Sequence, residues 1–304
     1  MVGGGQVRSE ERAYFATGLR RYLAATHLER RNEGEALRLP RVHGLELEDL
    51  AVCPNWLRDE ATLVLLRGIS ISRWPKTVAR IWTPWLQDLG FPRVLDCCSG
   101  ASGPWPGILQ QQSLQVTFCD RYPNLSAWDR IAQVFPGQVN YEVRPVDARC
   151  LPADFQGCWS FFNSFHHFAP DDARKVVEEA VHRRQPLAVF EVVDRHPLRM
   201  LAVILMPLVA LLSALWVRPF CWRRIFFTYL LPLIPLLLLW DGWMSCFRVY
   251  SREDWQEIIA QADPDGDYRW EFGTTPLGWF PMACPYVWGA PLQTTMFAAR
   301  PDEA

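Results

Sequence analysis

Two adjacent histidines, His166 and His167, are the residues in this sequence best suited to acid–base chemistry. They lie within residues 163–168, directly after Cys158–Phe162, an apolar run of the length of a buried strand. Histidine titrates near neutral pH, so either side chain is a candidate general base. A histidine pair after a strand also makes structural hydrogen bonds, and the sequence supports both interpretations equally.

A second candidate site is a turn of small residues. The run VLDCCSGASG, residues 94–103, predicts a strand from Val94 to Cys98 that enters a turn containing Gly100 and Gly103. Glycine lets a backbone approach a ligand closely, because it has no Cβ and tolerates positive φ. Doubly wound α/β folds bind nucleotide-like ligands at such a turn, after the first parallel strand. The spacing is not G-x-G-x-x-G, so a nicotinamide-type site fits poorly.

A carboxylate ends the next expected strand, residues 115–120. This residue, Asp120, stands 24 positions after Asp96. Doubly wound folds place a ribose-binding carboxylate at an offset of about 20 residues, and a carboxylate accepts hydrogen bonds from both ribose hydroxyls. The alternative is that Asp120 caps the following helix, since aspartate is a favoured N-cap residue. The strand and the spacing favour ribose binding.

The surrounding pattern predicts the elements that position these residues. Helices are expected at about 106–112, 125–134 and 170–184, and further strands at 139–143 and 187–193. Strands that alternate with helices at these spacings indicate a parallel sheet with right-handed crossovers.

Five segments together resemble the motifs of class I S-adenosylmethionine-dependent methyltransferases, in the same order. They are VLDCCSGASG, VTFCD, VRPVDA, SFFNSFHHF and LAVFEVVD, and they cover residues 94–194, about a third of the chain. The first segment departs from the commoner pattern, because Cys97-Cys98-Ser99 replaces an acidic or glycine-rich lead-in and Ala101 stands where glycine is frequent.

The resemblance implies an enzyme that binds S-adenosylmethionine and transfers its methyl group. It implies that Asp147 hydrogen-bonds the adenine amino group, although an exposed loop aspartate explains this residue equally well. It also places residues 163–168 beside the sulfonium. Glu191 and Asp194 are lesser candidates for a base, and no metal-binding cluster is evident. The residues expected at the cofactor are Asp96, Cys98, Gly100, Gly103, Asp120, Arg121, Asp147, Ala148 and Asn163.

The two ends of the chain are expected to complete this fold. Helices at 9–32, 46–66 and 78–89 would cap the cofactor end of the sheet. Ser251 and Asp254 form a capping-box pattern before a helix at 255–261. A sixth strand is expected at 268–272 and a seventh at 294–299, as an antiparallel edge. The proline- and aromatic-rich loop 273–293 between them is either a pocket wall or a braced surface cover, with equal weight.

The run Leu198–Trp240 is an apolar insertion in this plan. Met200–Val217 and Ile225–Trp240 carry no charge and would be ~27 Å and ~24 Å long as helices, near the lower limit of a membrane span. An arginine-rich link joins them. The hairpin could span a membrane, lie in its interface, or form a buried lid over a greasy substrate. We expect membrane association with the catalytic domain in the cytoplasm, because such a large apolar surface is rarely left exposed.

Composition limits the other classes of function. The 304 residues carry a net charge of −2, so nothing indicates nucleic-acid binding. The nine cysteines show no metal-binding spacing, which favours a reduced compartment, and no secretory signal is expected.

The predicted architecture is a doubly wound, mostly parallel seven-stranded α/β sheet, divided into a helical cap (1–90), a cofactor-binding core (91–197), an apolar hairpin (198–246) and the remaining core (247–304). The predicted function is methyl transfer to a hydrophobic or membrane-associated small molecule. The alternatives are a membrane-tethered S-adenosylmethionine-binding protein without transfer activity and, less favoured, a nicotinamide oxidoreductase.

Overall fold

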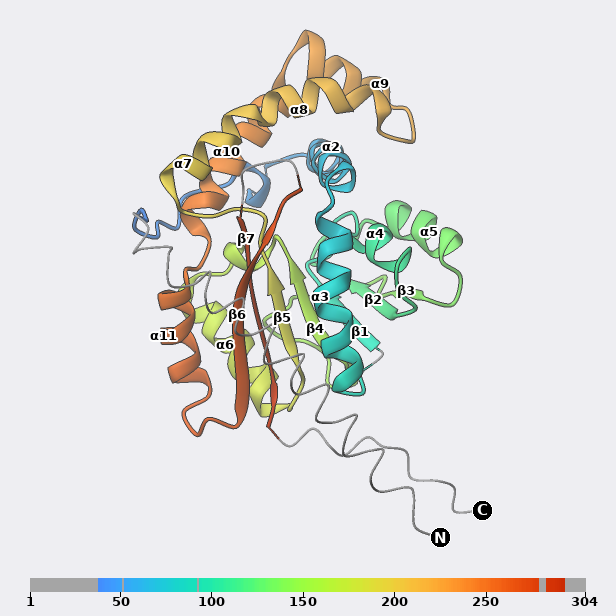
Figure 1. Cartoon of the computed structure of the whole chain (residues 1–304). Coiled ribbons are helices and arrows are strands. Elements are labelled where there is room, and N and C mark those ends of the chain that lie inside the picture. Colours follow the sequence, from blue (N-terminus) through green and yellow to red (C-terminus); the bar gives the residue numbers. More distant parts are fainter. Residues whose placement is uncertain (1–37, 51, 92, 279–282, 293–304) are drawn as a thin grey trace. The chain divides into compact units, whose positions relative to one another are not determined.

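The protein was analysed as a computed structural model (Figure 1), which describes residues 38–304 except 51, 92, 279–282 and 293–304. The helix expected at 9–32 lies outside the described residues. The described chain from Leu39 onward belongs to one unit.

The centre of the fold is a seven-stranded sheet in the order β3-β2-β1-β4-β5-β7-β6. The first five strands pair in parallel, and β7 pairs antiparallel with both β5 and β6. This arrangement confirms the predicted mostly parallel sheet with an antiparallel C-terminal edge. The strands are β1 (Arg93–Cys97), β2 (Gln115–Cys119), β3 (Val139–Tyr141), β4 (Cys158–Phe162), β5 (Leu187–Phe190), β6 (Tyr268–Pro276) and β7 (Ala283–Pro291).

Helices cover both faces of the sheet, because apolar side chains alternate along its central strands. In β5, Ala188 and Phe190 belong to one buried cluster, whereas Leu187 and Val189 belong to the other. The first cluster is covered by α3 (Trp74–Asp88), α4 (Trp105–Leu109) and α5 (Leu125–Val134), and the second by α6 (Pro170–His182) and α11 (Arg252–Ala262).

Two helix termini confirm the local signals in the sequence. The side chain of Ser251 accepts a hydrogen bond from the Asp254 amide while the Asp254 carboxylate accepts one from the Ser251 amide, which is the predicted capping box. At α5, the N-cap is Asn124, whose side chain accepts from the Ala127 amide at 3.1 Å. The alternative role of Asp120 as a helix cap is therefore wrong.

The expected loop at 273–293 is wrong, because β6 extends to Pro276 and β7 occupies Ala283–Pro291. The strand expected at 294–299 lies outside the described residues. Pro285 argued against a strand here, because proline has no amide hydrogen to donate to a neighbouring strand. The register of β7 shows why this proline is tolerated. Pairing with β5 ends at Tyr286, and Pro285 contributes only its carbonyl, which accepts from the Glu191 amide at 2.9 Å.

The first helix expected in the apolar insertion is present as one helical run, Pro197–Trp216, whereas the second is broken into two segments, Trp222–Leu230 and Leu233–Arg248. Pro207 stands in the first turn of one segment, and Pro232 precedes another, where the axis bends by 76°. The segments are α7 (Pro197–Met200), η3 (Leu201–Leu205), α8 (Met206–Ser213), η4 (Ala214–Trp216), α9 (Trp222–Ile225), η5 (Phe226–Leu230) and α10 (Leu233–Arg248).

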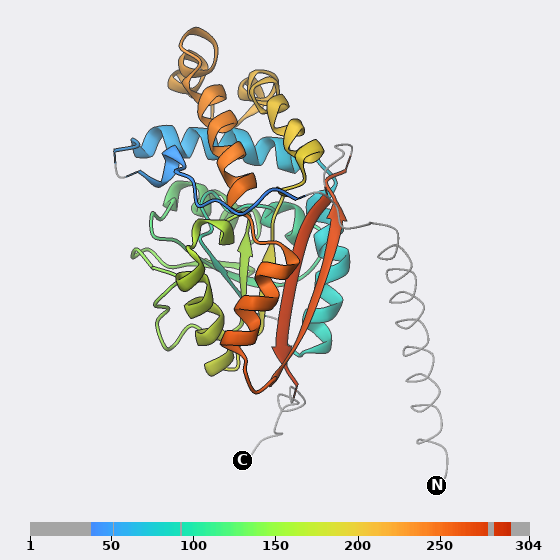
Figure 2. The same cartoon turned by 90° about the vertical axis from the view of Figure 1, so that its left-hand side faces the viewer.

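Helices α8 and α10 pack on α2 (Asn55–Ile71) beyond one end of the sheet (Figures 1 and 2), around Ala61, Val64 and Ile234. Within the arginine-rich link, Arg224 points inward. It is fully buried, pairs with Glu60 and donates to the carbonyls of Ala214 and Val217. Since those carbonyls end a helical segment, the arginine neutralises an end that would otherwise lack hydrogen-bond donors.

Candidate functional site

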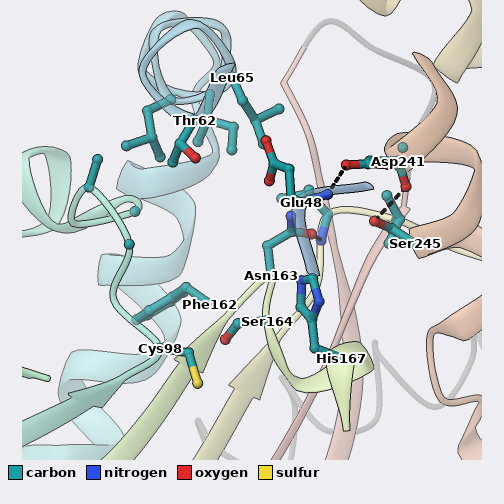
Figure 3. A pocket seen from close by; sticks show the side chains of 18 of the residues that line it. Glu48, Thr62, Leu65, Cys98, Phe162, Asn163, Ser164, His167, Asp241 and Ser245 are labelled. Carbon is teal, nitrogen blue, oxygen red and sulfur yellow. Dashed lines mark hydrogen bonds between the residues drawn. The ribbon is translucent and has the colours of Figure 1, made fainter. Parts of the chain in front are cut away.

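A cavity of about 940 Å³ opens where β1, β2 and β4 end. Its lining comes from the loops after these strands, from α2, from the segment around η1 (Leu47–Asp49), and from the apolar insertion. Figure 3 shows part of this lining. The position agrees with the general rule that open α/β sheets bind ligands beyond the carboxyl ends of their strands.

The turn after β1 forms one wall in a strained but well-anchored conformation. Gly100 and Gly103 have φ of 49° and 50°, and Cys98 and Ser102, which carry side chains, also have positive φ. The indole of Trp128 donates to the Gly100 carbonyl at 2.9 Å, which helps to fix the turn. A Cβ on Gly103 would meet Phe162 at 3.6 Å, which is an ordinary contact. The positive φ, and not a lack of space, is therefore what favours glycine here.

Asp120 joins this turn to the loop after β2. Its two carboxylate oxygens accept from the amides of Gly100 at 2.8 Å and Tyr122 at 2.7 Å. Burial raises the pKa of Asp120, although these two hydrogen bonds oppose the shift. The carboxylate lines the cavity and keeps free lone pairs, so it can accept further hydrogen bonds from a ligand.

Asp96 lies apart from the other residues expected at the cofactor. It is 1% exposed within the sheet, accepts from the Ser160 hydroxyl at 2.7 Å, and is absent from the cavity lining. Burial raises its pKa to about 7, and the hydrogen bond from Ser160 opposes the shift. In this position the side chain links β1 to β4.

The remaining expected residues line the same cavity: Cys98, Arg121, Asp147, Ala148 and Asn163. Asp147 pairs with Arg149 at 2.6 Å, and this hydrogen bond lowers the Asp147 pKa. Asn163 has φ of 51°, and its side-chain oxygen accepts from the Val192 amide at 3.2 Å, which ties the loop after β4 to the end of β5.

The two histidines, in the short helix η2 (Phe165–His167), have different environments. His166 is 1% exposed, and its Nδ1 lies 2.8 Å from the Glu191 carboxylate. A carboxylate only accepts hydrogen bonds, so Nδ1 carries the proton and a neutral ring keeps the Nε2 lone pair. This Nε2 faces Glu46 at 3.7 Å, beyond hydrogen-bonding distance. A base held in one tautomer by an acid is a common catalytic arrangement.

His167 stacks on His166 with ring centroids 4.5 Å apart, but it has the character of a cation. Its Nδ1 lies 2.9 Å from Asp49 and 3.5 Å from Glu46. Burial alone would lower its pKa, yet these two carboxylates raise it to about 9. A ring that already holds its proton at neutral pH is poorly suited to accept another, so His166 is the better candidate base.

The lesser candidates, Glu191 and Asp194, do not line the cavity. Glu191 acts on it only through His166, whereas Asp194 accepts from the His196 amide at 2.7 Å and pairs with Arg199. These contacts orient loops around the site.

An acidic end of the cavity was missed at the sequence level. It is formed by the segment before α2 and by α10, which bring together Glu46, Glu48, Asp49, Asp241 and Arg248. Arg248 donates to Asp49 at 2.6 Å and lies 3.2 Å from Glu46. The only sequence signal was Asp241, the one acid in a long apolar run.

Two further features of this end bear on ligands. Ligand atoms of Glu46, His166 and His167 lie within 4.8 Å of one another, a grouping that could hold a metal ion. The sequence showed no such cluster, because Glu46 is 120 residues from the histidines. Opposite the acids, Met206, Val209 and Leu212 of α8 form an apolar wall together with Leu65 and Leu66 of α2.

No protein-family model matches the chain, and no curated protein is similar to it. Solved structures give weak likenesses. The mitomycin 7-O-methyltransferase MmcR is 13% identical, with 74% of this chain and 53% of that chain covered and a TM-score of 0.43.

A putative O-methyltransferase from Nostoc punctiforme PCC 73102 is 10% identical, with 82% and 64% covered and a TM-score of 0.48. NcsB1, an O-methyltransferase of neocarzinostatin biosynthesis solved with S-adenosylmethionine and a naphthoic acid, is 14% identical, with 72% and 55% covered and a TM-score of 0.41. The chain spans about half the length of the first of these proteins. Likeness at this level carries no argument about activity.

Proposed function

We propose that the chain is an S-adenosylmethionine-dependent methyltransferase that acts on a hydrophobic small molecule. The observation that carries the proposal is convergence: of the nine residues expected at the cofactor from motif order, all except Asp96 line one cavity, together with both histidines. These residues come from loops after four different strands, so their meeting is a property of the fold and not of adjacency in the chain.

The residues present fit this cofactor. The turn offers backbone without a Cβ at Gly100 and Gly103, Asp120 has acceptor capacity for a ribose, and Asp147, in the cavity lining after β3, would accept from an adenine amino group. When bound, the cofactor supplies a methyl group on a sulfonium. His166, oriented by Glu191, would remove a proton from an acceptor that must lose one.

We also propose that the apolar insertion docks on a membrane surface. By length and composition, the segment Pro197–Trp216 could cross a membrane, and so could the bent pair Trp222–Leu230 and Leu233–Arg248. Docking in the interface is better supported than spanning, because the second helical run is bent by 76° at its break and the exposed Trp222 and Trp240 are typical of headgroup depth. Exposed Arg218 and Arg223 add attraction for anionic lipid.

The same insertion also lines the cavity, which supports a role as a lid. Ala202, Met206 and Val209 face the cavity, whereas other large side chains of the insertion are exposed: Leu198, Leu201, Leu208, Leu215, Phe220, Trp222, Leu230, Leu236 and Trp240. An apolar acceptor dissolved in lipid could therefore reach the site through this element.

Isothermal titration with S-adenosylmethionine tests the central proposal. We expect saturable binding that S-adenosylhomocysteine displaces and that Asp120→Ala weakens. No binding by the parent chain would exclude methyl transfer, and binding without turnover on lipids and hydrophobic phenols would favour a non-catalytic binding protein. Flotation with vesicles containing anionic lipid tests docking separately, and a chain that stays in the soluble fraction would leave the insertion as a lid only.

A further inference from the structure

The side chain of Glu48 projects into the cavity, and two hydrogen bonds fix its backbone. The Glu48 amide donates to Asp241 at 3.0 Å, and its carbonyl accepts from Arg58 at 2.9 Å. The side chain points away from Asp241, toward Thr62 and Leu65 of α2 (Figure 3). Its carboxylate has no hydrogen bond or ion pair with any residue that the structure describes.

The cations around Glu48 are engaged elsewhere. Arg248 of α10 binds Asp49 and Glu46, and His167 of η2 binds Asp49. Arg58 of α2 donates to two backbone carbonyls, of Glu48 and Leu50, and to the Asn55 side chain. The nearest acid on the facing helix, Asp241, is held by the amides of Leu47 and Glu48. Among the residues that the structure describes, Glu48 is thus the acid of this end whose carboxylate has neither an ion pair nor a hydrogen bond.

The electrostatic consequence is a site that favours a positive ligand. Burial, followed by repulsion from Asp241, raises the pKa of Glu48 to about 8. Burial also raises the pKa of Asp241, to about 6. An ionised carboxylate in such a place is costly without a partner, and a cation beside it would relieve the cost.

The opposite wall gives the rest of the ligand's character. Leu65 and Leu66 of α2 and Met206, Val209 and Leu212 of α8 offer only apolar side chains. A molecule at this end of the cavity therefore meets the carboxylate of Glu48 and an apolar surface. A neutral hydrocarbon would leave Glu48 unpaired, and an anionic lipid would add repulsion.

We propose that the acceptor is a cationic amphiphile whose protonated nitrogen pairs with Glu48 and whose apolar part packs on α2 and α8. That this ligand accepts a methyl group rests on the proposed methyltransferase function, whereas its charge and shape are inferred from the cavity alone. A divalent cation held by Glu46, His166 and His167 is the competing occupant of this end. It is less favoured, because Arg248 and the protonated His167 already neutralise Glu46 and Asp49.

Calorimetric titration of the full chain, without cofactor, tests the proposal. The probes are decylamine, decan-1-ol and decanoic acid at pH 7, below their micellar concentrations. We expect the amine to bind at least about tenfold more tightly than the alcohol and decanoate to bind most weakly. In Glu48→Gln the amine preference should disappear while alcohol affinity stays within about twofold. Glu257→Gln on the exposed face of α11 is the matched control and should keep the preference.

The parent chain gives a second reading that needs no variant, because its preference for the amine over the alcohol is itself the expected result. Equal affinity for the amine and the alcohol in the parent would overturn the proposal even if Glu48→Gln failed to fold.

The remaining outcomes distinguish the cationic ligand from a bound metal ion and from the proposed methyltransferase function. Tight Zn²⁺ or Mn²⁺ binding that abolishes any amine preference would assign the acidic end to a metal and contradict the proposal. Amine preference in a chain that never binds S-adenosylmethionine would leave the ligand class intact and remove the methyltransferase. Cofactor binding without amine preference would do the reverse.

Discussion

The two ends of the cavity differ in how far apart their residues stand in the sequence. The end at the glycine turn is built from loops after successive strands, and Gly100 and Asp120 are only 20 residues apart. The acidic end joins Asp49 to Arg248 across 199 residues. A site made of short motifs can be predicted from a sequence, whereas a site made of distant segments forms only when the chain folds. The two ends should also respond differently to mutation.

The largest effect should come from His166, which lies between the two ends. His166→Ala should lower kcat/KM by about 10²–10⁴-fold for an acceptor that must lose a proton, with little change in S-adenosylmethionine affinity. His182→Gln, exposed at the end of α6, is the control and should leave both quantities unchanged. Equal activity of His166→Ala and the parent would show that the histidine pair is structural.

Side-chain substitutions at the acidic end should lower the stability of the fold more than those at the glycine-turn end. Arg248→Met leaves Glu46 and Asp49 without their buried partner, so it should lower the free energy of unfolding by about 3–5 kcal/mol. Arg269→Met removes an exposed pair with Glu271 and should cost less than about 1 kcal/mol. Urea unfolding measures both. A small loss for Arg248→Met would mean that the distant segments are held together by apolar packing alone.

The contribution of the acidic end to the free energy of unfolding should depend on pH. The pKa of His167 is raised from 6.5 to about 9, so its stabilising contribution is complete below pH 6.5 and is lost as pH rises through 9. The contribution amounts to at most about 3 kcal/mol. Comparing urea unfolding of the parent and His167→Gln at pH 6 and pH 9.5 isolates it from Glu48, which titrates in the same range. A difference that does not shrink with rising pH would contradict this assignment.

The glycine-turn end should lose binding more than stability. Gly100→Val places a branched side chain at a φ of 49° inside the cavity, so we expect S-adenosylmethionine affinity to fall about 100-fold, or about 2.7 kcal/mol. Gly266→Val is the matched control for Gly100→Val, because Gly266 also has a positive φ, 68°, and the space around it is open. Both variants should lose about 1–2 kcal/mol of stability. Cofactor affinity that falls equally in the two would place the cofactor elsewhere.

The fold was predictable where local pattern and tertiary demand agree. Strand β4 begins and ends where the apolar run does, and the Ser251 capping box opens α11 as expected. Prediction was wrong at β7, where Pro285 and a cluster of aromatic residues suggested a loop. The open edge of β5 outweighed that local signal, because unpaired strand edges are stabilised by a further strand.

The glycine-turn end of the cavity was predictable for a related reason. Backbone turns such as that at Gly100, and acids that end strands such as Asp120, keep their roles through local geometry. The packing of α10 on the segment around η1 has no local signature. Nothing near Glu48 in the sequence indicates that Asp241 will hold its amide, or that Arg58 will hold its carbonyl.

By itself, the sequence determined the alternation of strands and helices in the parallel core, the small-residue turn and the position of the histidines after β4. Each depends on a period or spacing within some 20 residues. Only the tertiary structure decided that Glu191 orients His166, that Glu46 and Asp49 raise the pKa of His167, and that Glu48 lines the cavity together with the apolar side chains of α2 and α8. Those properties depend on burial and on charges from distant segments, and neither exists before the chain has folded.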